Sequence, residues 1–269
     1  MRIDISTFLV LFGAEMKKVW NRPILELTIV LLGLISVSSI QTLTQISVST
    51  EATVAFQSLV VNGVSGIITQ QMLPLIILCS ILMSLSFARD YEQGLMQTLL
   101  SSPVSRASFF IAKFIAVILP LACLAWGFVV FFIALNYYSN IFLVLQFTAM
   151  AFPFILLSLF FFGSIAALVS LAIKRTIPSA LTCMLIGLFF WFITTLTYDT
   201  IGTIANYLVL TPYKAPLITL DRLIGINYSA ETVAGSLPAW NFAFLTLLYA
   251  CIILFPTYLY FTRRFEIRE

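Results

Sequence analysis

The sequence predicts an all-α integral membrane protein, and the observations behind this prediction are its composition and the length of its apolar runs. Of 269 residues, 61% are hydrophobic and only 9% are charged, and the mean hydropathy is +1.07. Soluble proteins carry about 25% charged residues. A helix needs about 20 apolar residues to cross the roughly 30 Å hydrocarbon core of a bilayer. Several runs reach that length, so we expect a bundle of transmembrane helices.

Six apolar runs are long enough to span a membrane. The fourth run is long enough to need a tilt, or a lead-in from Ile141 that lies along the surface before Pro153. Prolines interrupt the second, third, fourth and sixth runs, where neighbouring helices can satisfy the carbonyls that a proline frees. The expected spans are Ile24–Leu43, Ile67–Phe87, Ile111–Leu135, Phe147–Ile173, Ile177–Thr197 and Trp240–Phe261.

The basic residues of the loops predict the orientation. Lys and Arg concentrate in the cytoplasmic loops of membrane proteins. With six spans, all of the 14 Lys and Arg residues except Lys214 and Arg222 fall on one side. We expect that side to be cytoplasmic and to hold both termini, as an even number of spans requires. The sequence therefore predicts a multi-pass protein of the plasma membrane.

Residues 1–22 have the pattern of an amphipathic helix that lies in the membrane interface. Apolar residues recur on one face at helical spacing. We expect Pro23 to help end this helix and to turn the chain into the first span. The segment is either an elbow that transmits motion to that span or a passive anchor. Its apolar centre is short and no small-residue cleavage site follows, so we expect no cleaved signal peptide. The polar face holds Asp4, Glu15, Lys17, Lys18 and Arg22.

Several classes of function are disfavoured by what the sequence lacks. It contains no histidine, so it cannot build a Ser-His or Cys-His nucleophile or an imidazole metal ligand. It also contains no G-x-x-x-x-G-K-[ST] phosphate loop. Glu26 is the only ionisable side chain that we expect near the hydrocarbon, which leaves almost no charge to carry coupled ions. We therefore expect no catalytic residue, metal or cofactor in this chain, and no nucleic-acid partner.

A charged segment from Arg89 to Lys113 separates two strongly apolar runs on the cytoplasmic side. A short amphipathic helix is expected after Gly94, ending near Pro103, because proline cannot donate a helical hydrogen bond. Ser105 can cap the next helix. Such a short helix is unstable alone in water, so its apolar face needs a partner protein or the headgroup layer. The residues of that face are Leu95, Met96, Leu99 and Leu100.

The rest of the chain predicts one domain over residues 1–269, because no long linker, low-complexity block or convincing repeat is present. A short helix is expected around Ala52 to Val61 in an outer loop. Residues 198–238 form the longest stretch outside the spans and mix charges with apolar patches, which suits re-entrant or interfacial helices on the outer side. Asn227 begins a glycosylation sequon there, although a three-residue pattern often arises by chance.

The charged segment resembles the first cytoplasmic loop of ABC-2 type permeases, the membrane subunits of ATP-binding-cassette exporters. The usual loop carries an acidic E-x-G, a Leu-Leu-x-x-Pro turn and a Gly-Lys. Here Leu95 and Ala112 replace the threonine and the glycine that are common in that pattern. Six spans with both termini inside also fit this family. The matching residues are Glu92-Gln93-Gly94, Leu99-Leu100-Ser101-Ser102-Pro103 and Lys113 in the loop, and Glu15, Lys17, Lys18, Arg22 and Pro23 in a segment similar to the family's elbow.

The resemblance implies a division of labour between subunits. Residues 88–110 would form a coupling loop whose helix docks into a groove of a separate ABC ATP-binding subunit, and the turn from Lys174 to Pro178 would add a smaller contact. Two such subunits would bind ATP and Mg, and a second permease subunit, identical or different, would complete the membrane domain. The implied docking residues are Asp90, Glu92, Gln93, Gly94, Leu95, Met96, Leu99, Leu100, Pro103, Arg106, Lys174 and Arg175.

By analogy with the family, the second and fifth spans would line a cavity that alternates between inward and outward access. Uncharged aromatic and hydroxyl side chains there suit an apolar or amphipathic cargo. Two alternatives remain open: a secondary transporter or channel that works without ATP, and an assembly protein that docks a partner through the same loop but moves nothing. The residues of the expected path are Phe189, Trp191, Phe192, Thr194 and Thr195.

Overall fold

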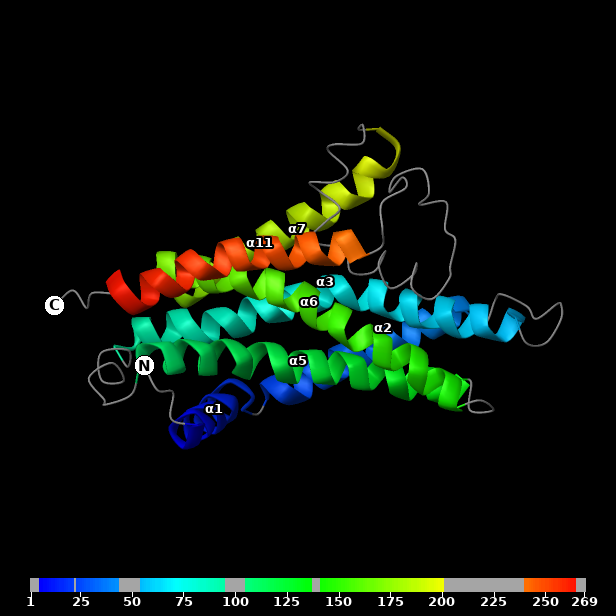
Figure 1. Ribbon diagram of the computed structural model, residues 1–269, viewed down its shortest axis with the longest axis horizontal. Helices are drawn as coiled ribbons and strands as arrows, with labels where there is room; N and C mark the ends of the chain where they lie inside the picture. Colours follow the sequence, from blue (N-terminus) through cyan, green and yellow to red (C-terminus); the bar gives the residue numbers. More distant parts are fainter. Residues whose placement is uncertain are drawn as a thin grey trace.

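The computed structural model describes residues 5–21, 23–43, 54–94, 105–136, 141–200 and 240–264. Within these ranges the regular structure is entirely helical, without strands, and Figure 1 shows the helices side by side in an elongated bundle. The elements are α1 (Ile5–Val19), α2 (Ile24–Leu43), α3 (Val54–Glu92), α5 (Arg106–Asn136), α6 (Ile141–Ile173), α7 (Thr176–Thr200), α11 (Trp240–Leu259) and the short π-helix η2 (Tyr260–Arg264).

The helices bear out the predicted fold class and part of the predicted span count. Each of the predicted apolar runs lies inside one helix, the last of them inside α11 and η2 together. Among the described residues, 4 helices can cross a membrane by length and composition, namely α3, α5, α6 and α11 in their apolar parts. The axes of α1 and α2 meet at 72°, and this pair would make a fifth span if it crossed as one unit. Six spans remain a prediction.

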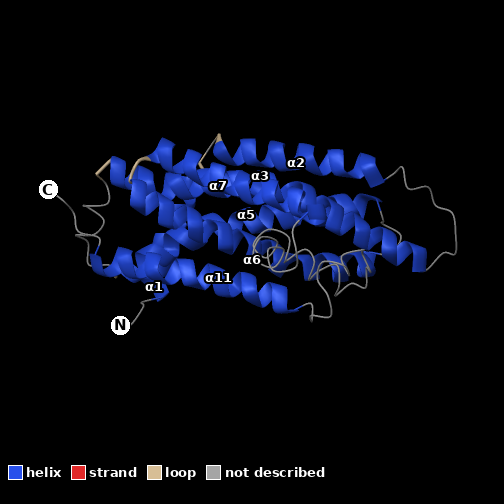
Figure 2. Ribbon diagram, turned by 90° about the horizontal axis from the view of Figure 1, so that it is seen from above, coloured by secondary structure: helices blue, strands red, loops and turns tan. Residues whose placement is uncertain are grey.

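The helices are arranged so that many of their charged residues meet at one end of the bundle. Figure 1 shows the first turns of α5 and α7 and the last turns of α3, α6 and α11 at the left-hand end of the bundle, with α1 below them. We call this the charged end. Figure 2 places α2 and α11 on opposite sides of the bundle. Between them, α3 packs against α2, α5, α6 and α7, and α6 packs against α3, α5, α7 and α11.

Glycines bring the central helices close together. A Cβ atom at Gly187 of α7 would overlap Cγ2 of Ile76 on α3. A Cβ atom at Gly163 of α6 would lie 2.8 Å from Cδ1 of Ile118 on α5. Inside a bilayer, helix association depends on close packing, because lipid tails are as apolar as the side chains. These two glycines therefore set the distance between neighbouring helices.

A proline in α5 exposes a carbonyl that the N-terminal helix region satisfies. Pro120 has no N–H to donate to the carbonyl of Ala116, one turn earlier. The indole Nε1 of Trp20, just after α1, donates to that carbonyl at 2.9 Å, and both residues are buried. The indole Nε1 of Trp126 on α5 also donates to a helix carbonyl, that of Thr148 on α6, at 2.7 Å. Trp20 therefore attaches the end of α1 to α5 at the point where the backbone hydrogen bonds of α5 lack a donor.

Three helix boundaries differ from the sequence prediction. The short helix expected around residues 52–61 is the beginning of α3, which continues without a break to Glu92. The lead-in expected before Pro153 is the first part of α6, which passes through that proline. α7 continues to Thr200. The remainder of the predicted outer stretch 198–238, including Asn227, lies outside the described residues.

Candidate functional site

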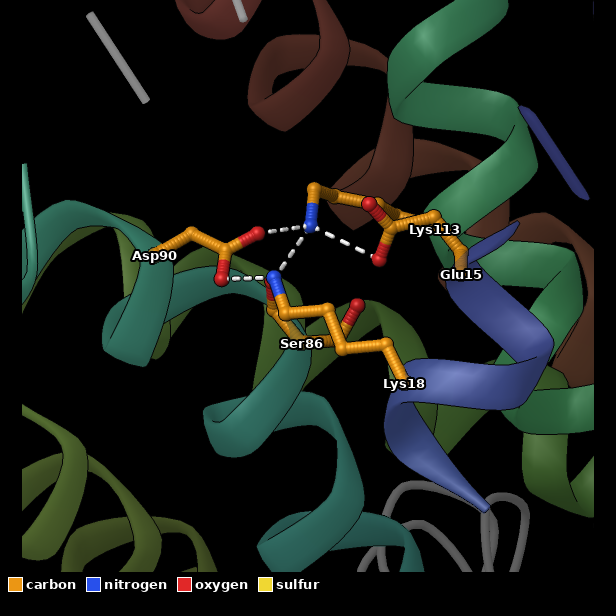
Figure 3. A network of polar contacts seen from close by, with 5 residues as sticks. All are labelled: Glu15, Lys18, Ser86, Asp90 and Lys113. Carbon is orange, nitrogen blue, oxygen red and sulfur yellow. Dashed lines mark hydrogen bonds and ion pairs between the residues drawn. The ribbon is translucent and has the colours of Figure 1, made fainter. Parts of the chain in front are cut away.

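The charged end contains a buried group of ionic contacts centred on Lys113, which Figure 3 shows in close-up. The Lys113 ammonium donates to Glu15 Oε2 of α1 at 3.0 Å, to the carbonyl of Ser86 on α3 at 2.7 Å, and to Asp90 Oδ2 on α3. Lys18 of α1 pairs with the other carboxylate oxygen of Asp90. We call Glu15, Lys18, Ser86, Asp90 and Lys113 the Lys113 network. It joins α1, α3 and α5.

The Lys113 network is balanced in charge and in hydrogen bonds. An ammonium group has three donors, and each has an acceptor here. The rings of Phe109 and Phe87 lie 4.8 and 5.9 Å from the Lys113 nitrogen, so their faces also favour the cation. Lys113 and Asp90 are fully buried. A buried charge is very costly without a partner, and the two carboxylates here match two ammonium groups.

Local sequence explains why these side chains meet. Ser105 Oγ accepts from the backbone N–H of Ser108 at 3.1 Å, which confirms the expected cap. Lys113 then lies about two turns into α5. Glu15 and Lys18 are three residues apart, so they share one face of α1. The aromatic residue Phe261 of η2 packs on Phe87, Phe109 and Phe110 and brings the end of α11 to the same place.

A second set of contacts lies on the other side of the end of α3. Oε2 of Glu92 accepts two hydrogen bonds from Thr176, the first residue of α7: from its backbone N–H at 3.1 Å and from its hydroxyl at 2.7 Å. The Lys174 ammonium donates to the Tyr91 hydroxyl at 3.2 Å and lies 4.6 Å from the centre of that ring. We call Tyr91, Glu92, Lys174 and Thr176 the α3–α7 clasp. Glu92 is exposed, and the other three residues are half-buried.

The two helices that end at the clasp use different residues for the same backbone geometry. Gly94 closes α3 with a φ of 69°, and Lys174 closes α6 with a φ of 60°. Glycine adopts this left-handed conformation at little cost, whereas a lysine does not. The Lys174 N–H bonds the Ser170 carbonyl at 3.1 Å, as such helix ends require. Lys174 thus combines a costly left-handed backbone conformation with side-chain contacts to Tyr91.

The predicted docking residues separate into three groups in the structure. Asp90 belongs to the Lys113 network, whereas Glu92 and Lys174 belong to the α3–α7 clasp. Gln93, Gly94, Arg106 and Arg175 are exposed at the charged end, where Arg106 donates to the Thr262 carbonyl at 3.5 Å. The residues that lie outside the described ranges are Leu95, Met96, Leu99, Leu100 and Pro103 of the loop and Arg22 of the predicted elbow.

The other predicted residues have no shared site within one chain. Lys17 and Pro23 are exposed. Phe189, Trp191 and Phe192 are exposed on α7, whereas the side chains of Thr194 and Thr195 are not described. Within the described ranges, no group of three or more His, Cys, Asp or Glu residues gathers where a metal could bind.

Lys113 is the residue whose position sequence reasoning missed. We singled out Glu26 as the ionisable group near the hydrocarbon; in the structure Glu26 is exposed on α2, and Lys113, within α5, is fully buried. The available signal was a single lysine in an otherwise apolar stretch, since such a residue requires a partner. Its partners were already singled out, Glu15 for the elbow and Asp90 for docking.

The apolar helices define the class of this protein, a multi-pass helical membrane protein. A family model described as ABC-2 family transporter protein matches residues 6–264. The chain therefore belongs to the ABC-2 family of transporters, as the loop motifs indicated. Membership implies a membrane transport component that associates with an ABC ATP-binding subunit. A comparison with curated proteins gives no match.

Proposed function

We propose that this chain is the permease subunit of an ATP-driven ABC exporter in the plasma membrane. It crosses the membrane six times, with both termini in the cytoplasm, and α1 lies as an elbow in the lipid interface. Two copies of a separate ATPase supply the energy, because the chain has no phosphate loop of its own. The cargo is apolar or amphipathic and crosses by alternating access.

The observation that carries this proposal is the set of bonds around the last turn of α3. Asp90 connects that turn to α1 and α5, and Glu92 connects it to α7. The predicted coupling loop follows directly. A force applied to that loop by an ATPase would reach three other helices through charge-assisted hydrogen bonds, which are stronger than neutral ones. An ATP-driven permease needs such a route from its motor to its membrane helices.

A second permease subunit, identical or different, completes the proposed transporter. The exposed face of α7 carries Phe189, Trp191 and Phe192. In one chain these aromatic side chains do not point into the core, whereas in a dimer they would face a shared cavity. Large aromatic surfaces favour apolar cargo, because burying them removes apolar area from water. Thr194 and Thr195 would add hydroxyl groups further along the same helix.

Loss of ATPase binding on disruption of the loop helix tests the proposal. The variant Leu99→Asp places a charge on the predicted apolar face, and Leu99→Met keeps that face apolar as a matched control. An affinity-tagged chain is purified from native membranes, and co-purifying proteins with a phosphate loop are identified by mass spectrometry. We expect the ATPase with the wild type and Leu99→Met and not with Leu99→Asp. An unchanged yield with Leu99→Asp would contradict docking through this helix.

Transport assays separate the alternatives. The purified complex is placed in liposomes, and ATP hydrolysis is measured with and without candidate apolar cargo. Stimulation by cargo supports an exporter. Hydrolysis that no cargo changes, combined with no movement of cargo, supports an assembly protein. Transport by this chain alone, without ATP or partner, supports a secondary transporter or channel.

A further inference from the structure

The α3–α7 clasp gives Glu92 a different role from the one implied by the family loop pattern. That pattern makes Glu92 a residue of the surface that contacts the ATPase. In the structure a single oxygen, Oε2, already accepts both the backbone N–H and the hydroxyl of Thr176, at 3.1 and 2.7 Å. Glu92 and Thr176 are 84 residues apart in sequence. The carboxylate is therefore engaged within the chain.

The position of Thr176 explains why the contact suits a carboxylate. Thr176 is the first residue of α7, and the first N–H groups of a helix have no partner within that helix. They also carry the positive end of the helix dipole, which favours a negative charge. Arg175 adds a full positive charge beside them. Glu92 thus caps α7 from another helix.

Two further features show that the turn between α6 and α7 is shaped against α3. Lys174 holds a left-handed backbone conformation, which costs a lysine free energy and persists only where surrounding contacts impose it. Its side chain reaches Tyr91 on α3, by a hydrogen bond of 3.2 Å and over the ring face. Adjacent residues of α3, Tyr91 and Glu92, therefore hold both sides of this turn.

We propose that Glu92 is a positioning residue that acts on the ATPase through Thr176. By fixing the Lys174–Pro178 turn beside the coupling loop, the clasp makes the two predicted docking points one preformed surface. A preformed surface binds more tightly because it loses less conformational entropy on binding. This inference rests on the proposed docking function, and it assigns Glu92 no direct contact with the partner.

A double-mutant cycle tests the proposal. Binding of the purified ATPase subunit is measured on the full chain in lipid nanodiscs, for Glu92→Ala, Thr176→Val and the double variant. We expect Glu92→Ala to weaken binding about fivefold, close to 1 kcal/mol. Thr176→Val removes only the hydroxyl bond and should have a smaller effect. In the Glu92→Ala background it should have none.

The controls distinguish positioning from direct contact. Glu92→Gln keeps an oxygen that can accept from Thr176 and should retain most of the binding. Thr182→Val is the matched control, because the Thr182 hydroxyl donates within its own helix, to the Pro178 carbonyl at 2.8 Å, and to no other part of the chain that the structure describes. Independent effects of Glu92→Ala and Thr176→Val that multiply in the double variant overturn the proposal, as does full loss of binding in Glu92→Gln.

A measurement without the ATPase separates failure of this inference from failure of the proposed function. A spin label is attached at Ile177→Cys, an exposed position next to the clasp, in a chain whose four cysteines are replaced by serine or alanine. We expect Glu92→Ala to increase the mobility of the label, and Thr182→Val to leave it unchanged. Unchanged mobility in Glu92→Ala shows that the clasp does not order the turn and overturns the inference, whether or not any ATPase binds.

Discussion

The two sides of the end of α3 hold their neighbours by different means. On one side the Lys113 network is buried, and every donor of the ammonium has an acceptor. On the other side, the bonds of Glu92 to Thr176 in the α3–α7 clasp are exposed, and the contact of Lys174 with Tyr91 is half-buried. Breaking a buried ion pair leaves an unpaired charge away from water, whereas exposed partners are solvated when they separate. We infer that the last turn of α3 is held more firmly to α1 and α5 than to the first turn of α7.

The largest expected effect comes from removing the buried cation. Lys113→Met leaves Glu15 and Asp90 buried with one cation fewer, and we expect it to lower the free energy of unfolding by about 3–5 kcal/mol. Thermal unfolding in detergent measures this loss. The exposed Lys17→Met is the matched control and should change little. Adding Glu15→Gln to Lys113→Met should recover part of the loss, and no recovery would contradict the network as described.

A similar but smaller loss is expected where α7 touches α3. Gly187→Ala places a methyl group against the branched side chain of Ile76, which has little freedom to move. Overpacking of this kind costs about 1–3 kcal/mol, so the melting temperature should fall. Gly127→Ala is the control, because a Cβ there meets nothing within 4 Å. If both variants behave alike, α7 is not held closely against α3 at this point.

The hydrogen bond between Trp20 and the Ala116 carbonyl is a second buried contact between the α1 region and α5. Trp20→Phe leaves a buried carbonyl without its side-chain donor and should cost about 1–3 kcal/mol. In Pro120→Ala the backbone of residue 120 regains an N–H, so Trp20→Phe should cost clearly less in that background. Melting temperatures of the four combinations measure this coupling. Equal losses in both backgrounds would show that the indole bond does not compensate for the proline.

The smallest effect on stability is expected at Glu92, the exposed residue of the clasp. Glu92→Ala should lower the melting temperature less than any of the changes above, because water solvates the separated groups. Raising the salt concentration should weaken the clasp by screening Glu92 from Arg175, and should leave the buried Lys113 network nearly unchanged. The mobility of a label at Ile177→Cys, measured at low and high salt, reports this difference. If the mobility of the label is the same at low and high salt, the charge of Glu92 does not contribute to this contact.

Local patterns predicted most of the helices and few of their contacts. The apolar runs predicted the helices and Ser105 predicted the cap of α5, because helix formation and capping depend on residues that are close in sequence. The cytoplasmic loop motif gave the family. The partnership of Lys113 with Glu15 could not be found this way, since these residues are 98 positions apart. The role of Glu92 was hidden for the same reason: its motif points to a partner protein, and only the fold brings Thr176 beside it.

The unbroken length of α3 has a consequence for how distant parts of the protein communicate. Its 39 residues correspond to about 58 Å of helix, nearly twice the thickness of the bilayer core. The helix that ends in the clasp therefore begins far from it, at the opposite end of the bundle. Pro74 lies near its midpoint and contributes no N–H to the ladder. If α3 tilts at the end that carries Glu92, its other end at Val54 is displaced, unless the helix bends at Pro74.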